Sequence, residues 1–139
     1  MKLYTSYYAQ IRNFPSNLIA LSTAVWKPKW LNFGANKNGV IMLNCKPLIP
    51  GRECEYLCRG NCEPPHPQDC AFLQTYRKQL DRIDFNDFYS YIEELSKKYN
   101  NADFAFMVYE TPNRPCSERV VIQQWFKEHG VKIEEWLEE

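Results

Sequence analysis

Four closely spaced cysteines form a candidate metal-binding group in this sequence. They are Cys54, Cys58, Cys62 and Cys70. Prolines and Gly60 between them exclude a long helix that would bring the thiols onto one face. They also leave the segment with too little apolar surface to fold unaided, and thiolate–metal bonds can supply that missing free energy. Three or four thiolates with an optional imidazole form a tetrahedral zinc set, and cysteine-ligated iron–sulfur is the alternative.

The C-x3-C-x3-C-x7-C spacing differs from the standard zinc-finger spacings, so the prediction depends on the density of ligands. We expect the four cysteines to hold a structural zinc ion, which is favoured over iron–sulfur by ligand type. His66 is the alternate ligand and is expected to face solvent. Four protein ligands would close the coordination sphere and leave no open position for catalysis. The alternative is a surface loop of reduced, unliganded cysteines, which would be prone to oxidation.

A second group of candidate residues follows an apolar run and surrounds Cys116. If Cys116 opens a helix, free backbone N–H groups and the positive end of the helix dipole would favour a thiolate or a bound anion there. Arginines nearby could donate to phosphate or carboxylate, and Glu110 could act as a general base or accept from a ribose hydroxyl. The residues expected to carry chemistry are Cys116, Glu110 and Arg119, and those expected to bind the ligand are Thr5, Ser6, Arg114 and Ser117.

The alternative for this second group is structural. Free cysteine is among the most buried residue types, so Cys116 beside Val120 and Val121 could fill the core, and residues 117–119 could form an ordinary first helical turn. A third possibility is sulfur or redox chemistry, which would require a thiolate at Cys116 near neutral pH.

The elements that must position these residues alternate between strands and helices. Short apolar runs predict strands at residues 3–8, 18–22, 104–109 and 131–133, and residues 40–43 fit a brief strand or a helical turn. Helical spacing of apolar residues predicts helices at residues 71–83 and 85–99, and a third that begins at Cys116 and stops at Gly130.

This alternation favours one α/β domain over residues 1–139: a mostly parallel open sheet flanked by helices. Residues 53–70 are then a cysteine-rich, metal-binding insertion in that domain. Ligands of open α/β sheets bind outside the carboxyl ends of the strands, where the segment from Glu110 to Cys116 is expected to lie.

Composition excludes several classes of protein. The 139 residues are 45% hydrophobic and 24% charged, as in globular domains and unlike disordered or fibrous chains. Seventeen basic and seventeen acidic side chains cancel, so no overall field draws the chain to nucleic acid or to an anionic membrane. Neither a secretory signal nor an apolar run of membrane-spanning length is apparent, so we expect a cytoplasmic protein with no membrane partner.

Aromatic side chains make up 15% of the chain. Five of them near its start could stack on nucleic-acid bases, with neighbouring lysines on phosphates: Tyr4, Tyr7, Tyr8, Trp26 and Trp30. The zero net charge favours the alternative, in which these rings fill the core and cover the sheet.

Several stretches resemble the family called domain of unknown function 488. In residues 106–136, Tyr109-Glu110-x-Pro112 is followed by Cys116, an arginine and an amphipathic helix. The opening Tyr4-Thr5-Ser6-Tyr7 resembles the family's phage and gut-bacterial members, and residues 58–80 are similar to a cysteine-bearing branch. The resemblance implies an α/β fold with an uncharacterised activity.

Family positions carry over residue by residue. In that family a strand ending in Cys-x-Glu leads to a Cys-His-Arg helix start. Glu110 and Cys116 stand at matching positions, and Arg119 is displaced by one. Val108 and Ser117 stand where the family has its first cysteine and its histidine, so the resemblance implies no Cys–His nucleophilic pair.

The sequence therefore predicts a structural zinc knuckle and a cleft at the Cys116 helix start that binds a nucleotide or another phosphate-bearing ligand. A nucleotide- or nucleic-acid-processing enzyme is one function that fits these features. The alternative is a non-enzymatic, zinc-stapled module that binds a protein or a nucleic acid.

Overall fold

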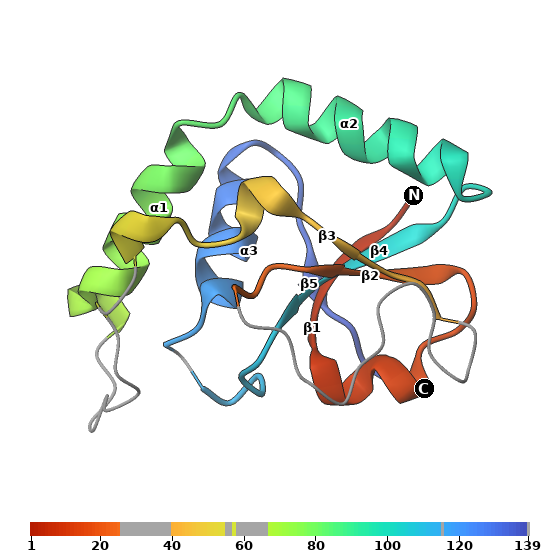
Figure 1. The fold of residues 1–139 in the computed structure, drawn as a ribbon, viewed down its shortest axis with the longest axis horizontal. Coiled ribbons are helices and arrows are strands. Elements are labelled where there is room, and N and C mark those ends of the chain that lie inside the picture. Colours follow the sequence, from red (N-terminus) through yellow and green to blue (C-terminus); the bar gives the residue numbers. More distant parts are fainter. Residues whose placement is uncertain (26–39, 55–56, 58–66, 115, 139) are drawn as a thin grey trace.

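Five parallel strands form one sheet in the part of the chain that the computed structural model describes, which is residues 1–25, 40–54, 57, 67–114 and 116–138 (Figure 1). The strands are β1 (Leu3–Tyr7), β2 (Leu18–Ser22), β3 (Met42–Asn44), β4 (Asp103–Val108) and β5 (Glu134–Glu135). Their order across the sheet is β3-β2-β4-β1-β5, and each pair is parallel. The predicted α/β class and parallel sheet are confirmed.

In the described residues, three α-helices and four short 3-10 helices connect the strands. They are α1 (Ala71–Asp81), α2 (Phe85–Lys98), α3 (Glu118–Glu128), η1 (Tyr8–Asn13), η2 (Lys46–Leu48), η3 (Arg52–Cys54) and η4 (Pro67–Asp69). No helix in these described ranges is both long enough and apolar enough to cross a bilayer.

β4 lies at the centre of the sheet because its side chains are apolar in both directions. Phe104 and Phe106 face one side and Ala105 and Met107 the other, and all four are fully buried. Such continuous apolar runs are typical of parallel strands that are covered on both faces.

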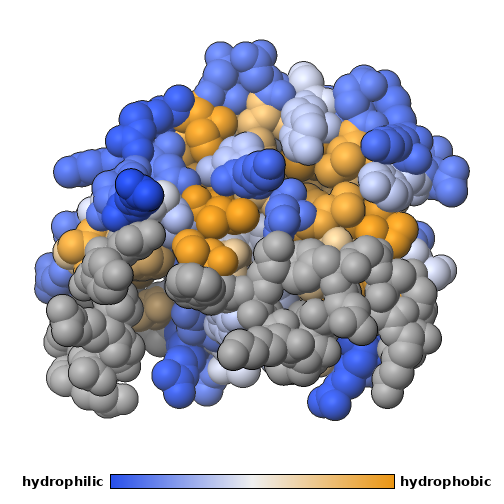
Figure 2. Space-filling model, viewed as in Figure 1, coloured by the Kyte–Doolittle hydropathy of each residue, from blue (hydrophilic) through white to orange (hydrophobic). Residues whose placement is uncertain are grey.

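The two faces of the sheet are covered differently. Side chains of α1, α2 and α3 pack with Phe104 and Phe106 in the larger core, where Trp125 and Phe126 of α3 are completely buried. On the opposite side, η1 covers Ala105 and Met107 with Tyr8 and Ile11, together with Phe14, which directly follows η1. Figure 1 accordingly shows η1 and α2 on opposite sides of the strands. Figure 2, viewed from the same direction, shows hydrophilic side chains along the rim over α2 and hydrophobic ones beside them.

Capping residues fix the two ends of α2. The Asp84 carboxylate accepts a hydrogen bond from the Asp87 N–H at 3.0 Å, which pairs one of the free donors of the first turn. At the other end, Asn100 and Asn101 both have φ of 60°, a left-handed conformation that asparagine tolerates better than most residues and that ends the helix.

Two of the predicted boundaries that differ from the structure affect the site. α3 begins at Glu118 and not at Cys116, because Ser117 takes the N-cap position that serine prefers. The last strand is Glu134–Glu135 and not residues 131–133. Val131 and Ile133 pack against the core before the chain reaches β1, so pairing with the sheet begins only at the two glutamates.

Candidate functional site

The carboxyl ends of β1, β2 and β4 meet at one edge of the sheet, and α3 begins beside it. Because the strands are parallel, the residues after Tyr7, Ser22 and Val108 lie at this same edge. Polar side chains gather here: Thr5 and Ser6 in β1, Ser22 in β2, Glu110 after β4, and residues 117–119 at the start of α3. The structure therefore brings most of the predicted site residues together at the place where open α/β sheets bind ligands.

Ser117 connects the helix start to Glu110. Its hydroxyl oxygen accepts the Arg119 backbone N–H at 3.3 Å and donates to Oε2 of Glu110 at 3.1 Å. The other oxygen of Glu110, Oε1, has no hydrogen-bond partner among the described residues. One serine thus caps the helix and holds a carboxylate with an acceptor atom left for a ligand.

Arg119 is buried, with only 4% of its surface exposed. Its guanidinium donates to the backbone carbonyls of Glu110 at 2.7 Å and Thr111 at 3.2 Å, and it pairs with both carboxylate oxygens of Glu135 at 2.6 and 3.2 Å. These four hydrogen bonds occupy the face that a phosphate would need. The arginine in this structure ties a loop to a strand.

A second set of hydrogen bonds continues from Glu135 into the sheet. The Thr5 hydroxyl donates to Oε1 of Glu135 at 2.8 Å and accepts from the Gln123 side-chain amide at 2.7 Å. Thr5, predicted to bind ligand, is fully buried and satisfied by protein groups. Glu135 and Gln123 were missed by sequence reasoning, because only the folded chain places them beside Thr5. Glu135 arrives there through the parallel pairing of β5 with β1, and Gln123 through its position in α3.

Glu118 is the most unusual titratable group at this edge. It is half-buried at the first position of α3, and no ion pair with it occurs among the described residues. Burial, reinforced by the nearby Glu110 carboxylate, raises the pKa of Glu118 from 4.5 to about 7. Sequence reasoning treated it as an ordinary first-turn acid, since a glutamate there usually faces solvent and interacts with the helix dipole.

The opposite side of the same edge carries buried hydroxyl groups. Tyr8 and Ser22 share a hydrogen bond of 2.7 Å, and burial raises the pKa of Tyr8 to about 12. The Tyr109 ring lies 5.0 Å from the Tyr8 ring. Ser6, predicted to bind ligand, is fully buried, and its hydroxyl is the one buried side-chain polar atom without a partner in the described part of the chain.

Cys116 and Arg114 lie in the loop that leads into α3, beside this network. Cys116 is half-buried and precedes the N-cap, so its thiol is outside the first helical turn in which it was predicted. Arg114 is exposed, and its backbone N–H donates to the Thr111 carbonyl at 3.0 Å. A catalytic role for Cys116 and a ligand-binding role for Arg114 stay predictions.

The predicted zinc ligands are described only in part. Cys58, Cys62 and the alternate ligand His66 lie outside the described residues, and within those residues no group of three or more metal-ligating side chains occurs. Cys54 is buried in the core, 3.8 Å from Oε1 of Gln79, and burial raises the pKa of its thiol. Cys70 is the N-cap of α1. The zinc knuckle stays a prediction.

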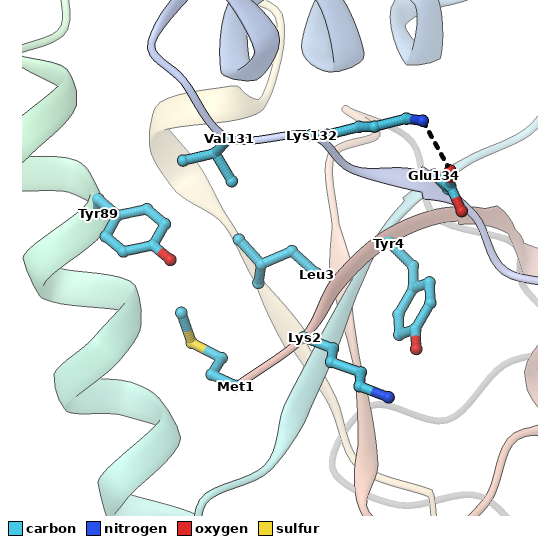
Figure 3. A pocket seen from close by; sticks show the side chains of 8 residues that line it. All are labelled: Met1, Lys2, Leu3, Tyr4, Tyr89, Val131, Lys132 and Glu134. Atoms are coloured by element: carbon cyan, nitrogen blue, oxygen red, sulfur yellow. Dashed lines mark ion pairs between the residues drawn. The ribbon is translucent and has the colours of Figure 1, made fainter.

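A cavity of about 420 Å³ opens at the other end of β1, away from these residues. Figure 3 shows Met1, Leu3, Tyr89 and Val131 pointing toward one another on one side of it, whereas Lys132 pairs with Glu134 at 3.2 Å. None of the predicted catalytic or ligand-binding residues lines this cavity.

The charges at the carboxyl edge differ from the predicted anion site. Arg119 is neutralised by Glu135, whereas Glu110 and Glu118 add two carboxyl groups at the start of α3. Two carboxyl groups at the helix start oppose the negative charge of a phosphate placed there. Comparisons with protein-family models, curated proteins and solved structures give no match to the chain.

Proposed function

We propose that this chain is an enzyme in which Glu118 exchanges a proton with a small, hydroxyl-bearing substrate at the carboxyl edge of the sheet. The observation that carries the proposal is the pairing of two carboxyl groups with unequal surroundings. Glu110 is hydrogen-bonded by Ser117, whereas Glu118 is half-buried without an ion pair. Two such groups in different environments are a common basis for acid–base assignments.

Glu118 is suited to proton transfer because its pKa of about 7 lies close to neutral pH. At that pH both its protonated and its ionised forms are populated, so it can act as an acid in one step and as a base in another. The fixed neighbour Glu110 has a different role in the proposal: its free Oε1 accepts a hydrogen bond from a substrate hydroxyl and orients it toward Glu118.

The substrate class follows from the charges at the site. Two carboxyl groups accept hydrogen bonds from vicinal hydroxyls, such as those of a ribose, and repel an anion. A nucleoside fits these requirements, and a nucleotide fits if its phosphate lies away from the helix start, toward the exposed Arg114. The predicted nucleotide ligand is thus retained with its sugar, and not its phosphate, at the carboxyl groups.

The first test combines side-chain NMR with two kinds of ligand. Protein labelled with 13C at the glutamate carboxyl carbons is titrated with ribonucleosides and, separately, with inorganic phosphate. We expect saturable shifts of Glu110 and Glu118 with at least one nucleoside, lost in Glu118→Gln and kept in the control Glu134→Gln, an exposed position in β5. Phosphate alone should leave both signals in place.

Two results would overturn the proposal. One is a Glu118 carboxyl that titrates at its ordinary value of 4.5 in the wild-type protein. The other is a response of Glu110 and Glu118 to phosphate with none to any nucleoside, which would favour the anion site that the sequence predicts.

A further inference from the structure

Glu135 lies in the last strand, yet it is connected to the loop that carries Glu110. Its carboxylate takes two hydrogen bonds from the Arg119 guanidinium, and the remaining N–H groups of that guanidinium hold the carbonyls of Glu110 and Thr111. A continuous chain of hydrogen bonds therefore runs from β5 through α3 to the loop after β4.

The position of Glu110 is fixed at two points. Arg119 holds its backbone carbonyl at 2.7 Å, and Ser117 holds its carboxylate at 3.1 Å. Both holders belong to the start of α3, the same turn that presents Glu118. Arg119 is in turn paired with Glu135, whose hydrogen bonds among the described residues go to Arg119 and Thr5 and to neither candidate carboxyl group.

Burial explains why Arg119 needs this partner. The two side chains are only 5% and 15% exposed, so an unpaired guanidinium in this place would be strongly disfavoured. Thr5 adds a third hydrogen bond to the same carboxylate and is itself held by Gln123. Buried ion pairs add little net stability compared with apolar packing, but their fixed geometry can orient what they hold.

We infer that Glu135 is a positioning residue: through Arg119 it holds the Glu110 loop against the start of α3 and so sets the distance between Glu110 and Glu118. This inference rests on the proposed function, which gives the two carboxyl groups their roles, but it can be tested without any ligand. The alternative is that Glu135 only stabilises the fold, so that its removal changes neither the position of Glu110 nor the pKa of Glu118.

The test compares two neighbouring glutamates in β5. Glu135→Gln keeps the shape of the side chain and removes the charge that orients Arg119, and Glu134→Gln makes the same change at an exposed residue. Amide 15N relaxation reports the order of Glu110 and Thr111, and 13C titration reports Glu118. In Glu135→Gln we expect the loop to lose order and the pKa of Glu118 to fall from about 7 toward its ordinary value, because the Glu110 carboxylate moves away. Glu134→Gln should match wild type.

Repeating the comparison in the Glu110→Gln variant separates a change in the position of Glu110 from the direct effect of charge on Glu118. Removing the Glu135 charge, and freeing the Arg119 charge, would lower the pKa of Glu118 even if Glu110 did not move. In Glu110→Gln there is no second carboxylate to displace, so Glu135→Gln should lower the Glu118 pKa less there than in wild type. Equal decreases in the two backgrounds, or an unchanged order of the loop, would overturn the inference.

Thr5→Val provides a milder variant if Glu135→Gln fails to fold. It removes one hydrogen bond to Glu135 and leaves the ion pair. Its effects on the loop and on Glu118 should have the same direction and a smaller size, and an unchanged Glu118 would count against the inference. Failure of the proposed function is recognised separately, in the wild-type protein, by a Glu118 that titrates normally.

Discussion

Arg119 and Glu135 form a two-point ion pair across the boundary between α3 and β5, with N–O distances of 2.6 and 3.2 Å and both side chains largely out of water. The pair joins the first turn of a helix to the last strand of the sheet. Its removal on one side only leaves a buried, unpaired charge, which makes it a sensitive position for mutation.

Arg119→Ala should therefore destabilise the fold by about 3–5 kcal/mol, since Glu135 would stay buried without its partner. Chemical denaturation measures the loss. The double variant Arg119→Met with Glu135→Leu removes both charges and should be more stable than Arg119→Ala. A loss below about 1 kcal/mol in the single variant, the range of exposed ion pairs, would contradict the burial described above.

Glu118 should make the stability of the protein fall as pH rises. Its pKa is about 7 in the folded state and 4.5 when unfolded, so the folded chain binds more protons between these values. The stabilisation is complete below pH 4.5 and is lost as pH rises through 7, by on the order of 1–3 kcal/mol. Glu118→Gln should remove this decrease in the free energy of unfolding when unfolding is measured from pH 4.5 to 8. If the variant keeps the decrease seen in wild type, another group causes it.

Ser117→Ala should destabilise the protein by about 1 kcal/mol, because the N-cap hydrogen bond of α3 is lost. Ser117→Thr keeps the hydroxyl and should restore most of the loss. The exposed Ser90 in α2 is the control, since Ser90→Ala removes no cap. Thermal unfolding measures all three, and equal effects at the two serines would argue against capping by Ser117.

Ser6→Ala should stabilise the protein by about 1 kcal/mol, because it removes a buried hydroxyl that has no partner among the described residues. Ser22→Ala, in β2, is the matched control. It should destabilise the protein by a similar amount, because the buried Tyr8 hydroxyl would lose its hydrogen bond with Ser22. If Ser6→Ala also weakens the shifts of the carboxyl signals on nucleoside addition, the Ser6 hydroxyl contributes to ligand binding and not to stability.

Zinc analysis tests the cysteine prediction directly. We expect one zinc per chain in natively purified protein, with a lower melting temperature after chelation, because thiolate–zinc bonds contribute to folding. Cys58→Ser should abolish the zinc content. Cys45→Ser is the control, since that thiol is buried in the core, where burial raises its pKa to about 12. Protein without stoichiometric metal, and with a melting temperature that chelator leaves unchanged, would rule the knuckle out.

The core of the fold could be predicted from the sequence because its signals are local. The apolar run of β4 and the helical spacing that ends at Asn100 depend on neighbours in the chain. β5 could not be predicted, because its two glutamates are unfavourable strand residues by themselves. One of them is stabilised by Arg119, and that contact exists only in the folded chain.

The sequence predicted that the candidate residues gather at one edge of the sheet, but not which groups they contact there. The carboxyl ends of parallel strands meet at the same edge, so the loop after β4 could be placed from topology alone. Whether Arg119 faces a ligand or a carboxylate depends on the register of β5 against β1, which the sequence does not encode locally. The burial that raises the pKa of Glu118 likewise comes from distant segments.

The placement of β1 has a consequence for synthesis on the ribosome. β1 leaves the ribosome first among the strands, but its two neighbours in the sheet are β4 and β5, which begin at Asp103 and Glu134. Nascent β1 therefore has both edges open until most of the domain has been translated. Such long sequence separation slows folding and leaves apolar strands exposed to aggregation, so a chaperone that shields the emerging N-terminal segment should raise the yield.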